Sequence, residues 1–380
     1  MNLNVKKLTL ITLTHIINDS YTGFIPMVIP VLISRGYSVA LAGSLGMILT
    51  LATNFPQPLF GLLYDKTKKY LIFLAPLFSA VFIGTAALMP SYFLIALFLV
   101  TGGLGVALFH PEATHIARST ESGNSNFAVS IFLAGGTGGY AAGGLAAGLL
   151  IWGFGLKGLL FTVIFGILAS YYLYKHRAFL SGAEGMDSGA PPVLRNIKEV
   201  NRIPEFLLIF SIVTIIVSVQ ATTAMFLPAY LKQKGISIVF SAIAFILFTV
   251  PGSLGGIAAG KLAKRFSLKK LILVSQLLAV AFLYAFVFTP YPYFIIFIPL
   301  AGCALLSSFP LLVNQSYTYL PENKGVAGGS IIGLTWGLAS VLILLTGALA
   351  DLGGSLAYAY KIIFALPLIA CLLLLKLKIK

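Results

Sequence analysis

The chain has 380 residues, of which 59% are hydrophobic and only 9% are charged. Because a soluble globular domain carries about 25% charged residues, this composition excludes an ordinary soluble protein. The formal net charge is +15, but the basic residues are concentrated in alternate loops between apolar runs, so we predict a membrane protein with no nucleic-acid partner. The two cysteines, Cys303 and Cys371, lie inside apolar runs, which excludes a disulfide framework and a cysteine metal site.

Long apolar runs follow one another from end to end of the chain. A hydrocarbon core about 30 Å thick needs about 20 helical residues, and the runs are long enough to cross it. They are continuously apolar and do not alternate with polar residues, so we predict helices and not a β-barrel. The expected fold class is an all-α integral membrane protein with twelve transmembrane helices, at roughly 8–33, 39–62, 70–90, 92–117, 125–150, 157–176, 205–231, 237–260, 270–289, 291–318, 326–350 and 356–375.

The positions of the basic residues predict which way the chain crosses the membrane. Of the 25 lysines and arginines, 20 fall on one side when alternate loops are assigned to the same side. This positive-inside bias predicts cytoplasmic N- and C-termini in a multi-pass protein of the cell (cytoplasmic) membrane, in contact with membrane lipids. The first apolar run is too long for the core of a cleavable signal peptide, so none is predicted.

A polar interval at 177–204 divides the twelve runs into two groups of six. Its glycine, proline, serine and charged residues are typical of a solvated connection. We therefore predict an N-terminal six-helix bundle over 1–176, a cytoplasmic linker over 177–204, and a C-terminal six-helix bundle over 205–380.

The two halves also match each other in their turn residues. Gly61 and Gly260, which precede basic loops, are separated by 199 positions, and so are Pro111 and Pro310. A shared offset predicts a duplicated six-helix unit, the arrangement in which two bundles rock about a site near the middle of the membrane. Chance matches in a glycine-rich membrane protein are the alternative.

Two acidic residues, Asp19 and Glu112, are the only ones inside the long apolar stretches, and the other eight fall in loops or at the ends of runs, where we expect water to solvate them. A charged side chain at the centre of a bilayer costs roughly 2.5 to 3.5 kcal/mol on insertion scales, so acids there usually face a polar cavity and mark ion or proton pathways. Both have histidine neighbours. The predicted proton-coupling residues are Asp19, Glu112, His15 and His110.

Helical geometry gives the first run one polar face. Thr12, His15, Asp19 and Thr22 follow one another at spacings of three, four and three residues, which places them on one stripe. An imidazole then lies one turn from the Asp19 carboxylate, and a duplicated transporter would direct this stripe into its cavity. The alternative is an Asp19 that is only hydrogen-bonded inside the bundle.

The fourth run is less clear. His110 and Glu112 are two residues apart, so an undistorted helix directs them about 200° apart. Pro111 removes one backbone hydrogen bond, and a kink there would bring the two side chains together. The segment His110-x-Glu112-x-x-His115 does not have the zinc-binding spacing H-E-x-x-H, so neither a metal site nor a cofactor is predicted.

The interiors of the apolar runs in the second half contain uncharged polar residues and no acids. With the offset of 199, the counterparts of Asp19, His110 and Glu112 are Ser218, Phe309 and Leu311. This asymmetry assigns proton binding to the first bundle and part of the substrate contact to both. The residues predicted to line the substrate cavity are Asn18, Thr22, His115, Gln220, Thr223, Asn314 and Gln315.

The loop after the second run resembles the signature G-x-L-x-D-R-x-G-R-K of the major facilitator superfamily. Gly61, Leu63, Asp65, Lys66 and Lys69 match it, whereas a lysine stands where the second glycine is expected. The resemblance implies that Gly61, Asp65, Lys66 and Lys69 form a latch that holds one conformation. The alternative is a solvated, positively charged turn.

Two further segments, 15–24 in the first run and 103–113 in the fourth, resemble the fosmidomycin-resistance branch of that superfamily, drug exporters for which proton drive is expected. The fifth run is similar to the antiporter motif G-x3-G-P-x2-G-G, but Tyr140 replaces its proline. Small residues spaced by four let neighbouring backbones approach, as a packing seam or as a surface that slides during rocking. The predicted packing glycines are Gly135, Gly139, Gly143 and Gly144.

These observations predict a secondary active transporter. The favoured function is proton-coupled export (antiport, drug efflux, antibiotic resistance) of small drug-like or anionic compounds by alternating access. A proton-coupled importer of a small metabolite is the alternative, favoured by the missing proline. No nucleophile, metal-ligand set or phosphate-binding loop G-x4-G-K-[ST] occurs, so neither an enzyme nor ATP-driven transport is predicted. The expected partners are a small-molecule substrate, protons and lipids, and the expected state is a monomer.

Overall fold

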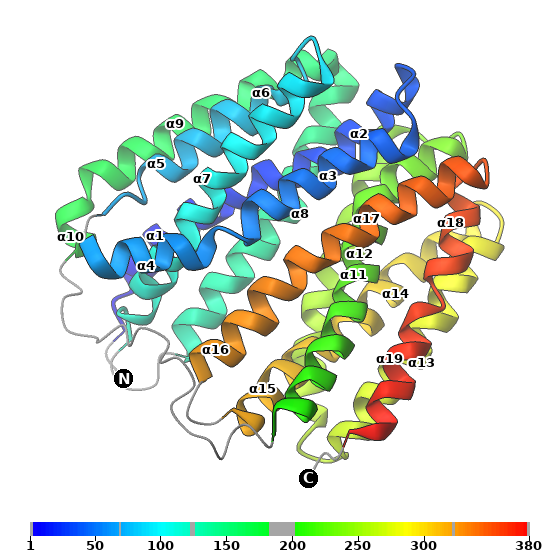
Figure 1. The fold of residues 1–380 in the computed structure, drawn as a ribbon. Coiled ribbons are helices and arrows are strands. Elements are labelled where there is room, and N and C mark those ends of the chain that lie inside the picture. Colours follow the sequence, from blue (N-terminus) through cyan, green and yellow to red (C-terminus); the bar gives the residue numbers. More distant parts are fainter. Residues whose placement is uncertain (1–2, 68–69, 122–125, 182–201, 321–323, 378–380) are drawn as a thin grey trace. The chain divides into compact units, whose positions relative to one another are not determined.

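The structure is a computed structural model that describes residues 3–67, 70–121, 126–181, 202–320 and 324–377. Within these ranges the chain is built from helices, and the one pairing of β type is an isolated bridge between Leu3 and Glu121 (Figure 1). The prediction of an all-α protein is confirmed.

The first six predicted spans form a series of helices, several of which are broken into shorter pieces. Their bounds are α1 (Val5–Ser20), η1 (Tyr21–Gly23), α2 (Phe24–Ser34), α3 (Val39–Asn54), α4 (Gln57–Thr67), α5 (Leu74–Phe78), η2 (Ser79–Ile83), α6 (Gly84–Ala86), α7 (Tyr92–Arg118), α8 (Asn126–Phe154), η3 (Gly155–Leu159), α9 (Leu160–Lys175) and α10 (Arg177–Ser181).

The second six spans follow after the linker. They are α11 (Ile203–Gln233), α12 (Ile238–Leu262), α13 (Leu268–Phe288), η5 (Tyr293–Ile296), α14 (Phe297–Ser307), α15 (Phe309–Tyr319), α16 (Lys324–Gly329), η6 (Ser330–Leu334), α17 (Thr335–Leu352), α18 (Leu356–Ile363) and α19 (Leu366–Lys376).

Ten helical spans of the described chain are long and apolar enough to cross a membrane. One of them, Phe127–Lys175, contains both α8 and α9, which are separated by a turn at Gly155 with φ of +62°. A shorter apolar helix covers Leu74–Ala86. Counting α8 and α9 separately and including this short helix gives the twelve predicted transmembrane helices. The cytoplasmic placement of the termini stays a prediction.

Helix boundaries repeat at the predicted offset of 199. α2 ends at Ser34 and α11 ends at Gln233, while α3 begins at Val39 and α12 begins at Ile238. The repeat is not perfect, because the 3-10 turn η1 interrupts the first span, whereas α11 is unbroken. Duplication has therefore preserved where helices begin and end better than it has preserved their internal shape.

The chain divides into two compact units. The first consists of Met1–Val28 with Ile48–Ala190, and the second of Ile29–Met47 with Pro191–Lys380. The hairpin between α2 and α3 thus groups with the second unit. Of the predicted linker, α10 covers Arg177–Ser181, while 182–201 lies outside the described residues. The proposed domain boundaries stay predictions.

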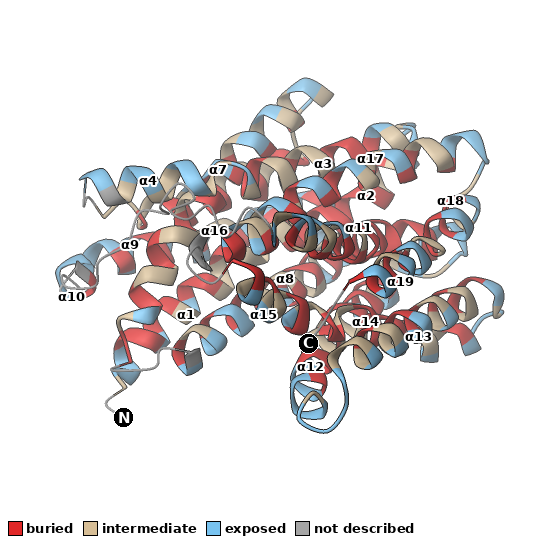
Figure 2. Ribbon diagram, turned by 60° about the horizontal axis from the view of Figure 1, so that its bottom comes forward, coloured by how far each residue is buried: buried red, intermediate tan, exposed pale blue. Residues whose placement is uncertain are grey.

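Within the first unit, α5 packs against both α7 and α9 (Figure 1). The face of α9 that is turned to these neighbours has small residues such as Gly166 and Ala169, whereas its exposed face has large ones such as Phe161 and Phe165. Figure 2 shows this alternation of buried and exposed residues along the helices. Small residues inside and large apolar residues outside are the pattern of a helix that faces lipid, because close backbone packing replaces the hydrophobic effect as the source of helix association.

The predicted glycine stripe lies where α8 meets the first span. A Cβ added at Gly135 would lie 2.7 Å from Thr12 Cγ2, and Cβ atoms at Gly139 and Gly143 would collide with backbone atoms of Ile16 and Ser20. Gly144 takes part as well, since its amide nitrogen would be 2.8 Å from a Cβ at Gly23. Only glycine permits this approach, and it brings the polar face of α1 close to α8.

Candidate functional site

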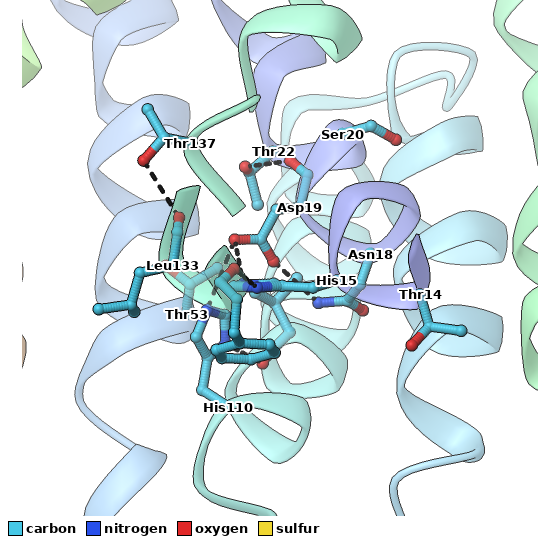
Figure 3. A network of polar contacts seen from close by, with 12 residues as sticks. Thr14, His15, Asn18, Asp19, Ser20, Thr22, Thr53, His110, Leu133 and Thr137 are labelled. Atoms are coloured by element: carbon cyan, nitrogen blue, oxygen red, sulfur yellow. Dashed lines mark hydrogen bonds and ion pairs between the residues drawn. The ribbon is translucent and has the colours of Figure 1, made fainter. Parts of the chain in front are cut away.

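Asp19 lies in the last turn of α1, just before the 3-10 turn η1. The Thr22 hydroxyl donates to the Asp19 carbonyl oxygen at 2.7 Å, and Gly23 has the close contact with α8 described above. These two contacts account for the change from α-helix to 3-10 helix. The Thr22 side chain occupies a backbone acceptor, and the backbone at Gly23 packs tightly against α8. The carboxylate therefore projects from a point where the helix changes pitch (Figure 3).

Two histidines from different helices point at one oxygen of Asp19 (Figure 3). His15 Nε2 lies 3.1 Å and His110 Nε2 lies 3.5 Å from Asp19 Oδ2. His15 is 2% exposed, while the side chains of Asp19 and His110 are 16% and 22% exposed. The cluster is thus closed on the His15 side and more open on the His110 side.

The remaining polar atoms of the cluster are held by the protein. His15 Nδ1 donates to the Phe132 carbonyl at 2.8 Å and His110 Nδ1 donates to the Val106 carbonyl at 2.9 Å, since a carbonyl oxygen can only accept. The His15 ring also stacks on the Phe132 ring, with a centroid separation of 4.1 Å. Both imidazoles are therefore fixed in orientation by the backbone of the bundle.

A second set of bonds fixes the other oxygen of the carboxylate. Asn18 Nδ2 donates to Asp19 Oδ1 at 3.1 Å, and the Asn18 amide oxygen accepts from the Ser79 hydroxyl at 2.9 Å. Ser79 belongs to η2, a π-helical segment. Asn18, which is predicted to line the substrate cavity, is fully buried here and positions Asp19.

Gly136 on α8 provides the space that the cluster occupies. A Cβ at this position would lie 2.5 Å from His15 Nε2 and 3.0 Å from Asp19 Oδ2. The first distance is shorter than real Cβ contacts, so the His15 ring would have to move to admit a larger residue at 136.

Glu112 is not part of this cluster. α7 continues through Pro111 as one helix, and the two side chains have different partners: His110 faces Asp19, whereas Glu112 faces the segment before α5. Glu112 Oε2 accepts from the amides of Leu71 and Ile72 at 3.2 and 3.1 Å. The structure therefore gives Glu112 the contacts of an anchor for the segment that leads into α5.

The other predicted cavity residues are distributed over both units. In the first unit, Thr22 follows Asp19, and the His115 ring lies 5.5 Å from the Tyr64 ring. In the second unit, Gln220 and Thr223 are buried in α11, and the Thr223 hydroxyl donates to the Val219 carbonyl at 2.6 Å. Asn314 is exposed and Gln315 is half-buried in α15.

The predicted latch is described only in part. Gly61 packs against Pro111, where an added Cβ would lie 3.6 Å from the proline Cβ, and Lys66 is exposed. The side chain of Asp65 and the whole of Lys69 lie outside the described residues. The latch stays a prediction.

One expectation from the sequence is wrong. Glu121 was expected in a solvated loop, but it is 1% exposed and its Oε2 accepts from the Ala128 amide at 3.0 Å. The carboxylate lies near the beginning of α8, where free backbone N–H groups and the helix dipole favour a negative charge.

Sequence reasoning also missed the parts of the site that come from α8 and η2. Phe132 acts through its carbonyl, which no residue type reveals, and Ser79 is an ordinary serine in an apolar run. Gly136 was visible only as one glycine among many.

The facing side-chain atoms of His15, Asp19 and His110 all lie within 4.8 Å of one another, so three of the four predicted proton-coupling residues come together.

The sequence matches a known family and two known proteins. The family model described as Major Facilitator Superfamily matches residues 9–343. The chain is 24% identical over 371 residues to the fosmidomycin resistance protein of Escherichia coli (strain K12), covering 95% of this chain and 90% of that protein. It is 26% identical over 363 residues to the uncharacterized MFS-type transporter YfnC of Bacillus subtilis (strain 168), covering 91% and 87%.

Among solved structures, the nucleoside transporter NupG has a similar fold, with a TM-score of 0.79 and 14% identity over the whole of both chains. Since the family model covers most of the sequence, the chain belongs to the major facilitator superfamily. It is a multi-pass membrane transporter of small molecules and not an enzyme.

Proposed function

We propose that this member of the major facilitator superfamily is a proton-coupled antiporter of the cell membrane that exports small drug-like or anionic compounds. The observation that carries the proposal is the cluster of His15, Asp19 and His110, a carboxylate with two imidazoles inside a transmembrane bundle. Ionisable groups at membrane depth that pair with one another are typical of proton relays in transporters.

The proposed cycle is alternating access. In the outward-facing state, the cluster takes up protons from the external side. In the inward-facing state, it releases them to the cytosol, and substrate leaves the cell in the opposite step. Coupling requires that the protonated and deprotonated clusters favour different conformations, because a ligand shifts an equilibrium only by its differential affinity for the two states.

Export is supported by one relative, the fosmidomycin resistance protein, at 24% identity. A proton-coupled importer of a small metabolite is the second candidate, and Tyr140 in place of the motif's proline favours it. The two candidates share the proton site and differ in whether substrate and protons move in opposite directions or together. Drug efflux, antibiotic resistance and a monomeric state belong to the proposal.

Flux into proteoliposomes under imposed pH gradients distinguishes them, with fosmidomycin as the first probe. An acidic interior drives uptake by an antiporter, because protons leave as substrate enters. An alkaline interior drives uptake by a symporter. We expect uptake with the acidic interior and its loss in Asp19→Asn. Flux that is the same under both pH gradients contradicts proton coupling. Uptake that occurs only with the alkaline interior contradicts the exporter and supports the importer.

A further inference from the structure

The hydrogen bonds around the two histidines determine where their exchangeable protons sit. Each ring has one nitrogen against a backbone carbonyl, Phe132 for His15 and Val106 for His110. A carbonyl oxygen carries no hydrogen, so these contacts are favourable only when Nδ1 is protonated. Both rings are therefore held in the Nδ1–H form, and Nε2 is the position at which each ring gains or loses a proton.

Both Nε2 atoms face the same carboxylate oxygen. When a ring is neutral, its Nε2 presents a lone pair to Asp19 Oδ2, which also bears lone pairs, and the contact is repulsive. His15 Nε2 lies 3.1 Å from this oxygen and has no hydrogen-bond partner. An ionised Asp19 therefore attracts this ring only when Nε2 is protonated. The same holds for His110 at 3.5 Å.

The ion-pair partners of Asp19 among the described residues are His15 and His110. From α8 the cluster meets the Phe132 carbonyl and Gly136, and from η2 it meets Ser79 through Asn18. Glu112, the remaining acid of α7, is bonded to backbone amides elsewhere.

We propose that the His15–Asp19–His110 cluster binds two protons, one on each Nε2, and exchanges both in each transport cycle. This inference rests on the proposed proton coupling and adds its stoichiometry. The His15 ring, stacked on Phe132, suits a cation because an aromatic face attracts positive charge. His110 is the more exposed ring, so protons enter and leave through it.

Loss of both protons has a structural consequence. Two lone pairs then face an ionised oxygen, and the contact between Asp19 on α1 and His110 on α7 is no longer attractive. Asp19 and His110 separate, and α1 is released from α7. Proton release thereby changes the packing of the bundle, which is the differential interaction that coupling needs.

Nitrogen-15 NMR of histidine-labelled protein in lipid nanodiscs tests the proton count without a substrate. The chain has four histidines, so His115→Gln and His176→Gln remove the two signals that do not belong to the cluster. We expect His15 and His110 each to change from imidazolium to the Nδ1–H neutral form as pH rises.

Three results would overturn the proposal. One is a neutral ring in the Nε2–H form, and another is a cluster in which only one of the two rings titrates. The third is a spectrum that changes on treatment with EDTA, which would show that a metal ion and not two protons occupies the Nε2 atoms.

A transport measurement separates the stoichiometry from the proposed function. At zero membrane potential, a tenfold proton gradient supports about hundredfold accumulation with two coupled protons and about tenfold with one. We expect about hundredfold for wild type and for the matched control His176→Gln. In His110→Gln we expect proton-driven accumulation to be lost, because the variant lacks both the proton entry route and the contact of α7 with Asp19. Tenfold accumulation by the wild type refutes the two-proton site but keeps proton coupling. No dependence on the gradient refutes the proposed function, while the NMR titration still decides the proton count.

Discussion

Equivalent positions of the two halves carry different chemistry. α1 of the first half has His15 and Asp19 where α11 of the second half has Thr214 and Ser218. The Thr214 hydroxyl donates to the Phe210 carbonyl of its own helix at 2.7 Å, so this position needs no partner on another helix. Asp19 has one partner on α7, His110, in addition to His15 on its own helix. The duplicated scaffold has thus retained its helix boundaries, while the ionisable cluster found among the described residues lies in the first half.

The two halves show that the helix boundaries and the ionisable cluster depend on different residues. Helix boundaries depend on turn and capping residues, and these recur at the same offset in both halves. The cluster depends on three side chains and one glycine, and the second half has Phe309 and Thr335 where the first has His110 and Gly136. If this asymmetry is functional, substitutions in the first-half cluster and at its second-half counterparts must have different effects.

The largest expected effect is that of Asp19→Asn. Asparagine keeps the size of the side chain but cannot carry the negative charge that holds His15 and His110. We expect proton-driven flux to fall by at least about a hundredfold, the lower range for loss of a positioned proton-transfer group, while exchange of substrate at equal pH continues. Ser218→Ala, at the equivalent position, is expected to keep the flux. Equal losses in both variants would contradict the asymmetry.

Glu112→Leu tests the other membrane acid by giving it the residue of its counterpart, Leu311. The substitution leaves the Leu71 and Ile72 amides without their acceptor, at a cost of about 1–3 kcal/mol for each buried group. We expect a lower thermal unfolding midpoint. In the milder Glu112→Gln, which keeps one acceptor oxygen, we expect unchanged dependence of flux on pH. A Gln variant of wild-type stability whose flux no longer responds to pH would instead support the predicted proton-coupling role.

Gly136→Ala tests the steric requirement of the cluster. Its methyl group would lie 2.5 Å from His15 Nε2, so the ring must move. Overpacking of this kind costs about 1–3 kcal/mol, and we expect a lower unfolding midpoint together with weaker proton-driven flux. Gly138→Ala, two residues away with no atom within 4 Å of the added Cβ, is the matched control and is expected to behave as wild type. Wild-type flux in Gly136→Ala would show that the cluster does not need this geometry.

Much of the fold was predictable from the sequence because membrane helices must be long, apolar and continuous. The twelve spans and the stripe with His15 and Asp19 follow from residue type and spacing alone. The pairing of His110 with Asp19 does not, since it depends on how α7 is rotated against α1. The burial of Glu121 was also missed, because its acceptor role involves a backbone amide and not a residue type.

The smallest expected effect belongs to Asp351, which distinguishes α3 from its counterpart α12. Both helices begin after a serine, and the hydroxyls of Ser38 and Ser237 accept from Leu41 and Phe240 amides at 3.1 and 3.3 Å. Among the contacts of the described residues, α3 alone has an additional carboxylate: within the second unit, Asp351 accepts from the amides of Val39 and Ala40, both at 2.8 Å.

We expect Asp351→Ala to lower the stability by about 1 kcal/mol, the usual value of a helix cap, because Ser38 remains and water can reach the exposed contact at Ala40. The measurement is the thermal unfolding midpoint. Asp351→Asn, which keeps one acceptor oxygen, is expected to lose less, and Ser237→Ala reports the value of the serine cap alone. If Asp351→Ala unfolds at the wild-type temperature, the additional carboxylate does not stabilise α3, and the two helix starts are equivalent in energy despite their different contacts.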